Sequence, residues 1–197
     1  MPLHDRIFGH FQASAQILLD AAESLAPQIE QAARLMVHSL TQGGKILACG
    51  NGGSAANAKH FASNMINRFE QERPGLATVV LNAESATLTA IANESAYDQV
   101  FARQIKALGQ PGDVLLAIST SGDSASVLQA MMAAHARSIP VIVLTGRRGG
   151  ALAERLQDDD VFLCIPAEST ARIQEVHLLT LHCLCDAVDS LLLGAEE

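Results

Sequence analysis

The chain has 197 residues, of which 49% are hydrophobic but only 4% aromatic, and its formal net charge is −8. This charge excludes a general attraction for nucleic acid, so we expect no direct nucleic-acid partner. No apolar run approaches the roughly 20 residues that span a bilayer, so we also expect no membrane partner. The first 30 residues do not have the basic start and apolar core of a secretion signal, so we do not expect secretion.

The first 43 residues are predicted to be helical, because apolar residues recur at helical spacing. One stripe begins at Ile7 and a second runs from Ile29 to Leu40, with Pro27 suited to the first turn of a second helix. We therefore predict two N-terminal helices. Two roles stay open for them: a subunit interface, or a cover for one face of a sheet.

Short apolar strands then alternate with helical stretches. The expected strands cover residues 45–50, 77–81, 113–118, 140–145 and 160–165, and the helices cover 54–69, 97–108, 123–137, 150–156 and 169–193. This alternation predicts an α/β fold with three layers around a doubly wound, five-stranded parallel sheet. We predict a single domain over 1–197, with N-terminal helices (1–43), an α/β core (44–168) and a C-terminal helix (169–194).

Two glycine- and serine-rich loops follow strands at the edge where such sheets bind ligands. They are residues 49–54 (CGNGGS) and 119–124 (STSGDS), and each leads into a helix. Glycines allow close backbone approach, hydroxyls donate hydrogen bonds, and a helix N-terminus attracts anions. Each loop alone is also a common helix cap. The pair, however, predicts a phosphate site.

The first loop has a weak similarity to dinucleotide-binding loops, since Gly50 to Ala55 reads G-x-G-x-x-A. Such folds place an acidic residue at the end of the next strand, where this chain has Asn82. We therefore predict a smaller phosphorylated ligand and no nucleotide cofactor.

A third group of polar residues lies on two predicted helices. His60 and Asn64 are one turn apart on one helix face. Gln174 and His182, about 80° apart around the last helix, can face one site, and His177 lies between them. Because helix histidines are more often structural, spacing alone does not choose between a metal site, proton transfer and a structural role.

These segments resemble the phosphoheptose isomerases, a family of sugar isomerase (SIS) domain proteins with a flavodoxin-like fold. Members interconvert sedoheptulose 7-phosphate and D-glycero-D-manno-heptose 7-phosphate. The segments are also similar to the DnaA initiator-associating protein, a relative not known as an isomerase. The resemblance rests on residues 49–56, 119–122 and 171–175, with His60, Phe61, Ser124 and His177.

The resemblance implies a role for each matching residue. It implies substrate binding by Asn51, Gly52, Gly53, Ser54, Asn93, Glu94, Ser119, Thr120, Ser121, Ser124 and Gln174. It also implies zinc bound by His60, Gln174 and His182, with His182 acting as the acid. Family members are homotetramers whose sites form between subunits, which gives the N-terminal helices a purpose.

Asn64 departs from the family, which has a glutamate there as catalytic base and zinc ligand. A carboxamide cannot accept and return the proton that moves between C1 and C2, and it binds zinc more weakly than a carboxylate. We therefore predict a sugar-phosphate-binding member with weakened zinc binding, and leave catalysis open. The alternative is a non-catalytic regulator that binds the replication initiator protein.

Two further features complete the prediction. Asp123, where the family usually has asparagine, is expected to point outward from the phosphate loop and stabilise a helix N-terminus. The four cysteines have the spacing of neither a disulfide framework nor a zinc ribbon, which favours a reducing, cytoplasmic location.

Overall fold

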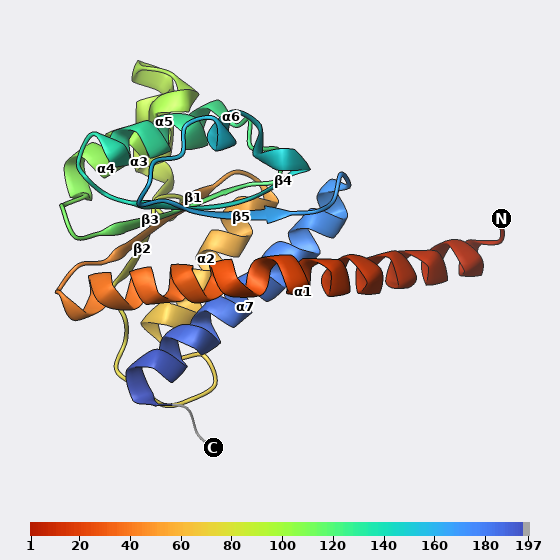
Figure 1. Ribbon diagram of the computed structural model, residues 1–197. Coiled ribbons are helices and arrows are strands. Elements are labelled where there is room, and N and C mark those ends of the chain that lie inside the picture. Colours follow the sequence, from red (N-terminus) through yellow and green to blue (C-terminus); the bar gives the residue numbers. More distant parts are fainter. Residues whose placement is uncertain (195–197) are drawn as a thin grey trace.

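The computed structural model describes residues 1–194 and has a parallel sheet at its centre (Figure 1). Five strands pair in the order β2-β1-β3-β4-β5, all parallel. They are β1 (Ile46–Gly50), β2 (Thr78–Val80), β3 (Val114–Ser119), β4 (Val141–Gly146) and β5 (Val161–Ile165), each end within one residue of the prediction. The doubly wound, flavodoxin-like sheet is therefore confirmed.

The helices follow the strands in the predicted alternation, with one addition. They are α1 (Leu3–Thr41), α2 (Gly53–Ile66), α3 (Ser85–Glu94), α4 (Val100–Leu108), α5 (Ala125–His135), α6 (Gly150–Ala153) and α7 (Thr170–Leu193), with 3-10 turns η1 (Tyr97–Gln99) and η2 (Arg147–Gly149). The sequence did not predict α3. Its residues are mostly small or polar and none is buried, so the segment has little apolar periodicity.

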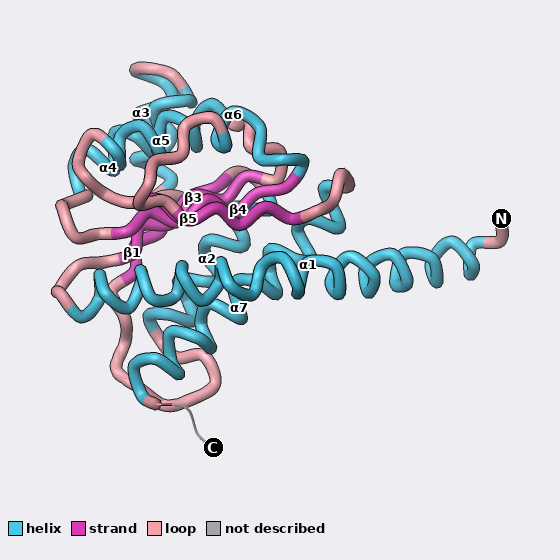
Figure 2. Tube along the Cα trace, in the orientation of Figure 1, coloured by secondary structure: helices cyan, strands magenta, loops and turns pink. Residues whose placement is uncertain are grey.

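The sheet separates two helical layers, as Figures 1 and 2 show. Alternate strand residues face opposite layers because side chains alternate along a strand. Ile46 and Ala48 pack with α1, α2 and α7, whereas Leu47 and Cys49 pack with α4 and α5. Both faces of the sheet are thus buried, which is typical of parallel sheets.

The prediction of two N-terminal helices is wrong, because α1 is one continuous helix of 39 residues with Pro27 in its interior. Proline removes one helical hydrogen bond and normally kinks or ends a helix. Here buried residues on both sides of it, Leu25 and Ala32 among them, join the same core and hold the helix together. The N-terminal end of α1 projects past the rest of the molecule (Figure 1).

Helix α7 is long and apolar enough to cross a membrane by length and composition alone. Its buried residues belong to the core, where it packs along α1 and α2, whereas Leu178, Leu179, Leu191 and Leu193 are exposed. It also carries Asp189, which forms a buried ion pair with Arg73 from the segment that follows α2. The helix therefore contributes to the hydrophobic core of the domain. All four cysteines are free.

Candidate functional site

The two predicted loops lie side by side at the carboxyl edge of the sheet. The first follows β1 and the second follows β3, the neighbouring strands between which the strand order reverses. In open α/β sheets this reversal is where ligands bind. The Asn82 amide fixes the first loop, since its Nδ2 donates to Gly50 O (2.8 Å) and its Oδ1 accepts from Gly50 N (3.3 Å).

A small cavity of about 160 Å³ opens between these loops. It is lined by Asn51, Ser54, Ile118, Ser119, Thr120, Ser121 and Ser124. None of these lining residues is basic, so hydroxyl groups and helix N-termini are the groups that it offers to a ligand. The predicted loop residues are thus brought together in one place.

The hydroxyl groups of the second loop accept hydrogen bonds from the protein itself. Ser119 Oγ accepts from Gly122 N (3.2 Å), and Ser121 Oγ accepts from Asp123 N (3.2 Å). A hydroxyl group has one donor hydrogen and two acceptor positions. Because the protein uses an acceptor position, the hydrogen of each hydroxyl remains free to donate to a ligand.

Gly122 is required at the turn of the second loop. Its φ is +75°, and a Cβ there would collide with the backbone of Gly149. Asp123 turns away from the cavity, and its Oδ1 accepts from Ala151 N (2.9 Å) at the start of α6. The expected outward orientation is therefore confirmed, although the helix start that Asp123 stabilises is that of α6 and not that of α5.

Helices α2 and α7 run side by side in the same direction beneath the first loop. A Cβ on Gly53 would collide with the Gln174 amide, so this glycine lets the two helices approach closely. Two turns further along, His60 of α2 meets His182 of α7, with their Nε2 atoms 2.9 Å apart. The helical rise places this histidine pair about 10 Å along α2 from Gly53.

Asn64 joins the histidine pair, with its Nδ2 3.3 Å from His60 Nε2. Either ring can carry the hydrogen that the two histidines share, and the single lone pair of an imidazole nitrogen serves only one donor at a time. Burial and the neighbouring His60 lower the pKa of His182, while Glu70 raises it in part. The His182 ring is therefore neutral at neutral pH.

The donor set around the pair fits zinc only in part. Two nitrogens bound at 2.0–2.1 Å to a tetrahedral ion are about 3.4 Å apart, so a small opening of the pair would admit one. However, among residues 1–194 no third His, Cys, Asp or Glu joins the two histidines in a cluster. The Asn64 amide is the neutral donor beside the pair, whereas the Gln174 amide lies against Gly53, about two helical turns away.

Three predicted residues lie elsewhere. His177 is buried beneath the sheet, where its ring nitrogen Nε2 donates to Thr145 O (3.2 Å), so it belongs to the core. Asn93 and Glu94 are exposed at the end of α3. No hydrogen bond joins either of them to the two loops within the described part of the chain.

Sequence reasoning missed three residues that contact the site. Tyr97 donates to Asn51, Ser126 accepts from Asn51, and Arg73 ties the end of α2 to α7. Tyr97 is the only tyrosine in the chain, and Ser126 lies two residues after the loop that was identified. Little in the sequence indicates that these residues belong to the site, because the residues that they contact are distant in the sequence.

The fold and the cavity define a class of protein, a doubly wound α/β protein with a serine-lined cavity at the strand-order reversal. The SIS domain family model matches residues 10–146. A protein of Thiobacillus denitrificans named phosphoheptose isomerase is 78% identical over the full length of both chains. The Azoarcus protein of the same name is 60% identical, again over the full length of both.

A solved structure of phosphoheptose isomerase from Neisseria gonorrhoeae is similar with a TM-score of 0.92 and 49% identity, over 96% of this chain and 100% of that one. The structure of a Francisella tularensis phosphoheptose isomerase has a TM-score of 0.94 and 46% identity, over the same shares. The chain therefore belongs to the phosphoheptose isomerase family of SIS-domain proteins.

Proposed function

We propose that the protein binds a phosphorylated sugar, with the phosphate in the cavity between the two loops. The observation that supports this most is the hydrogen bonding of the cavity. Its serine oxygens already accept from the protein, as at Ser119 and Ser121, so their hydrogens can donate to a ligand, and such bonds are strongest when the acceptor is an anion. Asn51, Gly52, Gly53 and Ser54 would hold the sugar beside it.

The proposed reaction is the interconversion of sedoheptulose 7-phosphate and D-glycero-D-manno-heptose 7-phosphate. The similar proteins carry the name of this isomerase. A phosphate held by Ser119, Thr120, Ser121 and Ser124 leaves the sugar to extend about two helical turns toward His182. Asn93 and Glu94 would then bind the sugar's hydroxyl groups, with Gln174 on the opposite side.

Proton transfer is the step that this chain is poorly equipped to catalyse. Moving a proton between C1 and C2 needs a group that accepts and returns it, and Asn64 cannot. His182 is neutral and retains one free nitrogen, so it is the group proposed to handle the proton. We therefore propose an isomerase that binds its substrate well and turns it over slowly.

We further propose weak zinc binding by His60 and His182, assisted by the amide oxygens of Gln174 and Asn64. The ion would polarise the sugar's carbonyl and hydroxyl oxygens. Two neutral imidazoles and two amides lack the carboxylate that normally strengthens such a site.

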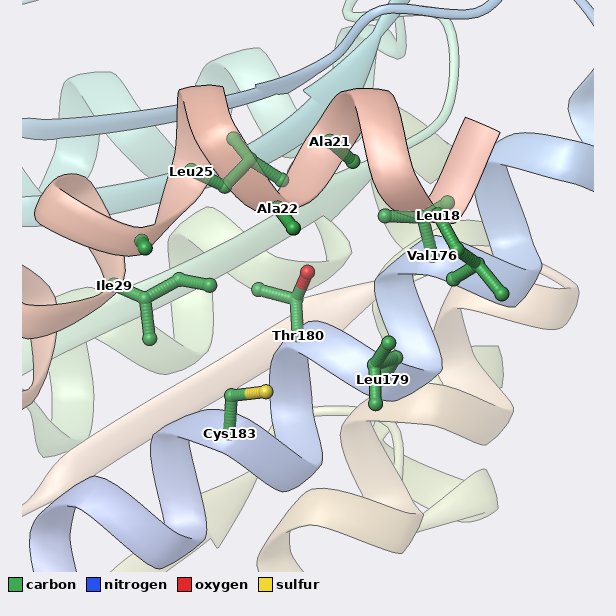
Figure 3. Close-up of a pocket in the computed structure, with 10 residues that line it drawn as sticks. Leu18, Ala21, Ala22, Leu25, Ile29, Val176, Leu179, Thr180 and Cys183 are labelled. Atoms are coloured by element: carbon green, nitrogen blue, oxygen red, sulfur yellow. The ribbon is translucent and has the colours of Figure 1, made fainter. Parts of the chain in front are cut away.

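The proposed assembly is a homotetramer. An apolar groove of about 160 Å³ lies between α1 and α7 (Figure 3). A second hollow of about 400 Å³ shares Ala26, Ile29 and Cys183 with it. The projecting part of α1 exposes further large apolar side chains, including Phe8 and Phe11. A groove and a row of exposed apolar side chains on the same helix suit a self-complementary interface between copies of the chain.

The proposed location is the cytoplasm, because free cysteines suit a reducing compartment.

A second function is favoured by one observation, the amide at position 64. A sugar-phosphate-binding regulator needs no base, and the DnaA initiator-associating protein is such a relative. In this alternative the partner is the replication initiator protein.

One experiment separates the two functions. Zinc-loaded protein is incubated with sedoheptulose 7-phosphate, the aldose is followed by NMR, and binding is measured by calorimetry on the same sample. Binding with slow production of the aldose supports the isomerase. Binding without any aldose, also after Asn64→Glu, supports the regulator, and absence of binding overturns both.

A further inference from the structure

The turn η2, which follows β4, has an unusual backbone. Arg147 and Arg148 have φ values of +49° and +66°, and Gly149 and Gly150 continue with +88° and +50°. This left-handed region is unfavourable for residues that carry a Cβ, and glycine adopts it freely. Two successive arginines in this conformation are therefore an outlier of the kind that accompanies function.

The turn lies directly against the second loop. Strand β4 is the neighbour of β3, so η2 and the second loop leave the same edge of the sheet side by side. A Cβ on Gly122 would collide with Gly149 O. One on Gly150 would collide with Ser121 O. The backbone of η2 thus packs on the loop that lines the cavity, and Arg148 is one residue away from this contact.

The two arginine side chains differ in their surroundings. Arg147 Nε donates to Glu168 O (3.0 Å) and its Nη2 to Thr170 Oγ1 (2.9 Å), so it ties the turn to the start of α7. Arg148 is exposed, and its side chain has no hydrogen bond or ion pair among residues 1–194. Neither packing nor hydrogen bonding accounts for an arginine at position 148, and its charge is the property that remains.

A positive charge at this place complements the cavity. The cavity has no basic residue in its lining, and Asp123 adds a negative charge to the same loop. The Asp123 carboxylate lies against Gly150, two positions after Arg148. Charges in solvent act on each other over about 8 Å at physiological salt, so Arg148 lies within range of the loop. The net charge of −8 otherwise repels an anionic ligand.

We propose that Arg148 is the cationic determinant of phosphate binding: its charge offsets that of Asp123 and attracts a phosphate group to the serine-lined cavity. The inference rests on the proposed function, since it assumes that phosphate occupies this cavity. It adds a residue outside both loops to the determinants of ligand affinity, and it explains why the turn carries a side chain that its backbone disfavours.

The test uses inorganic phosphate, the full-length protein and calorimetry. At low salt Arg148→Gln should lose about two- to fivefold in affinity, the effect of one solvated charge on a dianion at roughly 8 Å. The loss should disappear in about 0.5 M salt, which screens such charges, and Arg148→Lys should bind as the parent does. Lys106→Gln removes the same charge from the last turn of α4, which leads to the opposite edge of the sheet, and should have no effect.

Two further variants separate charge from structure. Arg148→Gly relieves the disfavoured backbone, so it should melt no lower than Arg148→Gln yet lose as much phosphate affinity. Asp123→Asn keeps the acceptor for Ala151 N and removes the negative charge, so it should bind phosphate more tightly than the parent. Combined with Arg148→Gln, it should return the affinity close to that of the parent.

Three results would overturn the proposal. A loss in Arg148→Gln that persists at high salt would mean that Arg148 contacts the ligand directly. An unchanged affinity in Arg148→Gln, with a loss in Ser124→Ala, would remove the role of Arg148 and leave the cavity as the phosphate site. If neither variant changed phosphate binding, the proposed location of phosphate would be wrong as well.

Discussion

The Nε2 atoms of His60 and His182 are 2.9 Å apart although 122 positions separate these residues in the sequence. The contact forms because α2 and α7 run side by side from the point where Gly53 meets Gln174. The Asn64 amide lies beside this pair, with its Nδ2 3.3 Å from His60 Nε2. A carboxylate at position 64 could only accept a hydrogen from His60, whereas an amide can donate or accept.

Phosphate affinity should depend on two hydroxyls of the cavity. Ser119→Ala and Ser124→Ala each remove one charge-assisted hydrogen bond, worth about 1.5–3 kcal/mol. Calorimetry with a sugar phosphate should show each single loss and a larger one in the double variant. Ser63→Ala, an exposed serine on α2, is the control and should bind as the parent does. A double variant with parental affinity would place the phosphate elsewhere.

Stability should decrease in acid because of His177. Burial lowers its pKa from 6.5 to about 4, and Nδ1 has no partner among the described residues. Between these pH values the unfolded chain binds a proton that the folded chain does not, so stability rises with pH and is lost as pH falls from 6.5 toward 4. The full loss is about 3 kcal/mol.

Urea unfolding at pH 7.5 and pH 4.5 tests this dependence. His177→Gln keeps a donor for Thr145 O but does not titrate in this range, so its stability should change less between the two pH values than the parent's does. The same substitution at the exposed His4 should leave the pH dependence unaltered. Equal pH dependence in His177→Gln and the parent would show that His177 is not responsible.

The sequence predicted the sheet and both loops because their signals are local. Runs of β-branched residues and a Gly- or Ser-rich turn are visible within a few positions, as at residues 119–124. The continuity of α1 was not visible, because packing on both sides of Pro27 outweighs a local helix-breaking residue. Tyr97 and Arg73 were missed because their partners lie 46 and 116 positions away.

A buried ion pair should hold the two histidine-bearing helices together. Arg73 and Asp189 have side chains only 1% and 6% exposed, and Arg73 Nη2 also donates to Asn64 O (3.1 Å) at the end of α2. Arg73→Met would leave a buried carboxylate unpaired, so unfolding experiments should show a loss of about 3–5 kcal/mol. The exposed Arg34–Glu30 pair provides the control, since Arg34→Met should cost under about 1 kcal/mol. Equal losses would refute the role of the buried pair.

Assembly should depend on the groove between α1 and α7. Leu179 lines the groove and is 45% exposed in a single copy of the chain. Leu108, on α4 in the opposite helical layer, is equally exposed and serves as the control. A charge buried in an apolar interface is costly, so Leu179→Glu should dissociate the homotetramer while Leu108→Glu should not. Light scattering at micromolar concentration measures both. A monomeric parent, or a tetrameric Leu179→Glu, would contradict the proposed interface.

Asn64 decides between an enzyme and a binding protein, and the parent should isomerise heptose phosphate slowly while binding it well. General base catalysis contributes about 10²–10⁴-fold, or roughly 3–5 kcal/mol of barrier. Asn64→Glu restores a proton acceptor and an anionic ligand beside His60, so zinc affinity by calorimetry and turnover by NMR should both rise, turnover by orders of magnitude. Asn64→Gln introduces a side chain as long as that of glutamate but without its charge, so it should raise neither quantity.

A parent that already turns over about once per second or faster would show that Asn64 does not disable the site. His182 would then have to be the base, and His182→Gln should abolish turnover with little change in sugar-phosphate affinity.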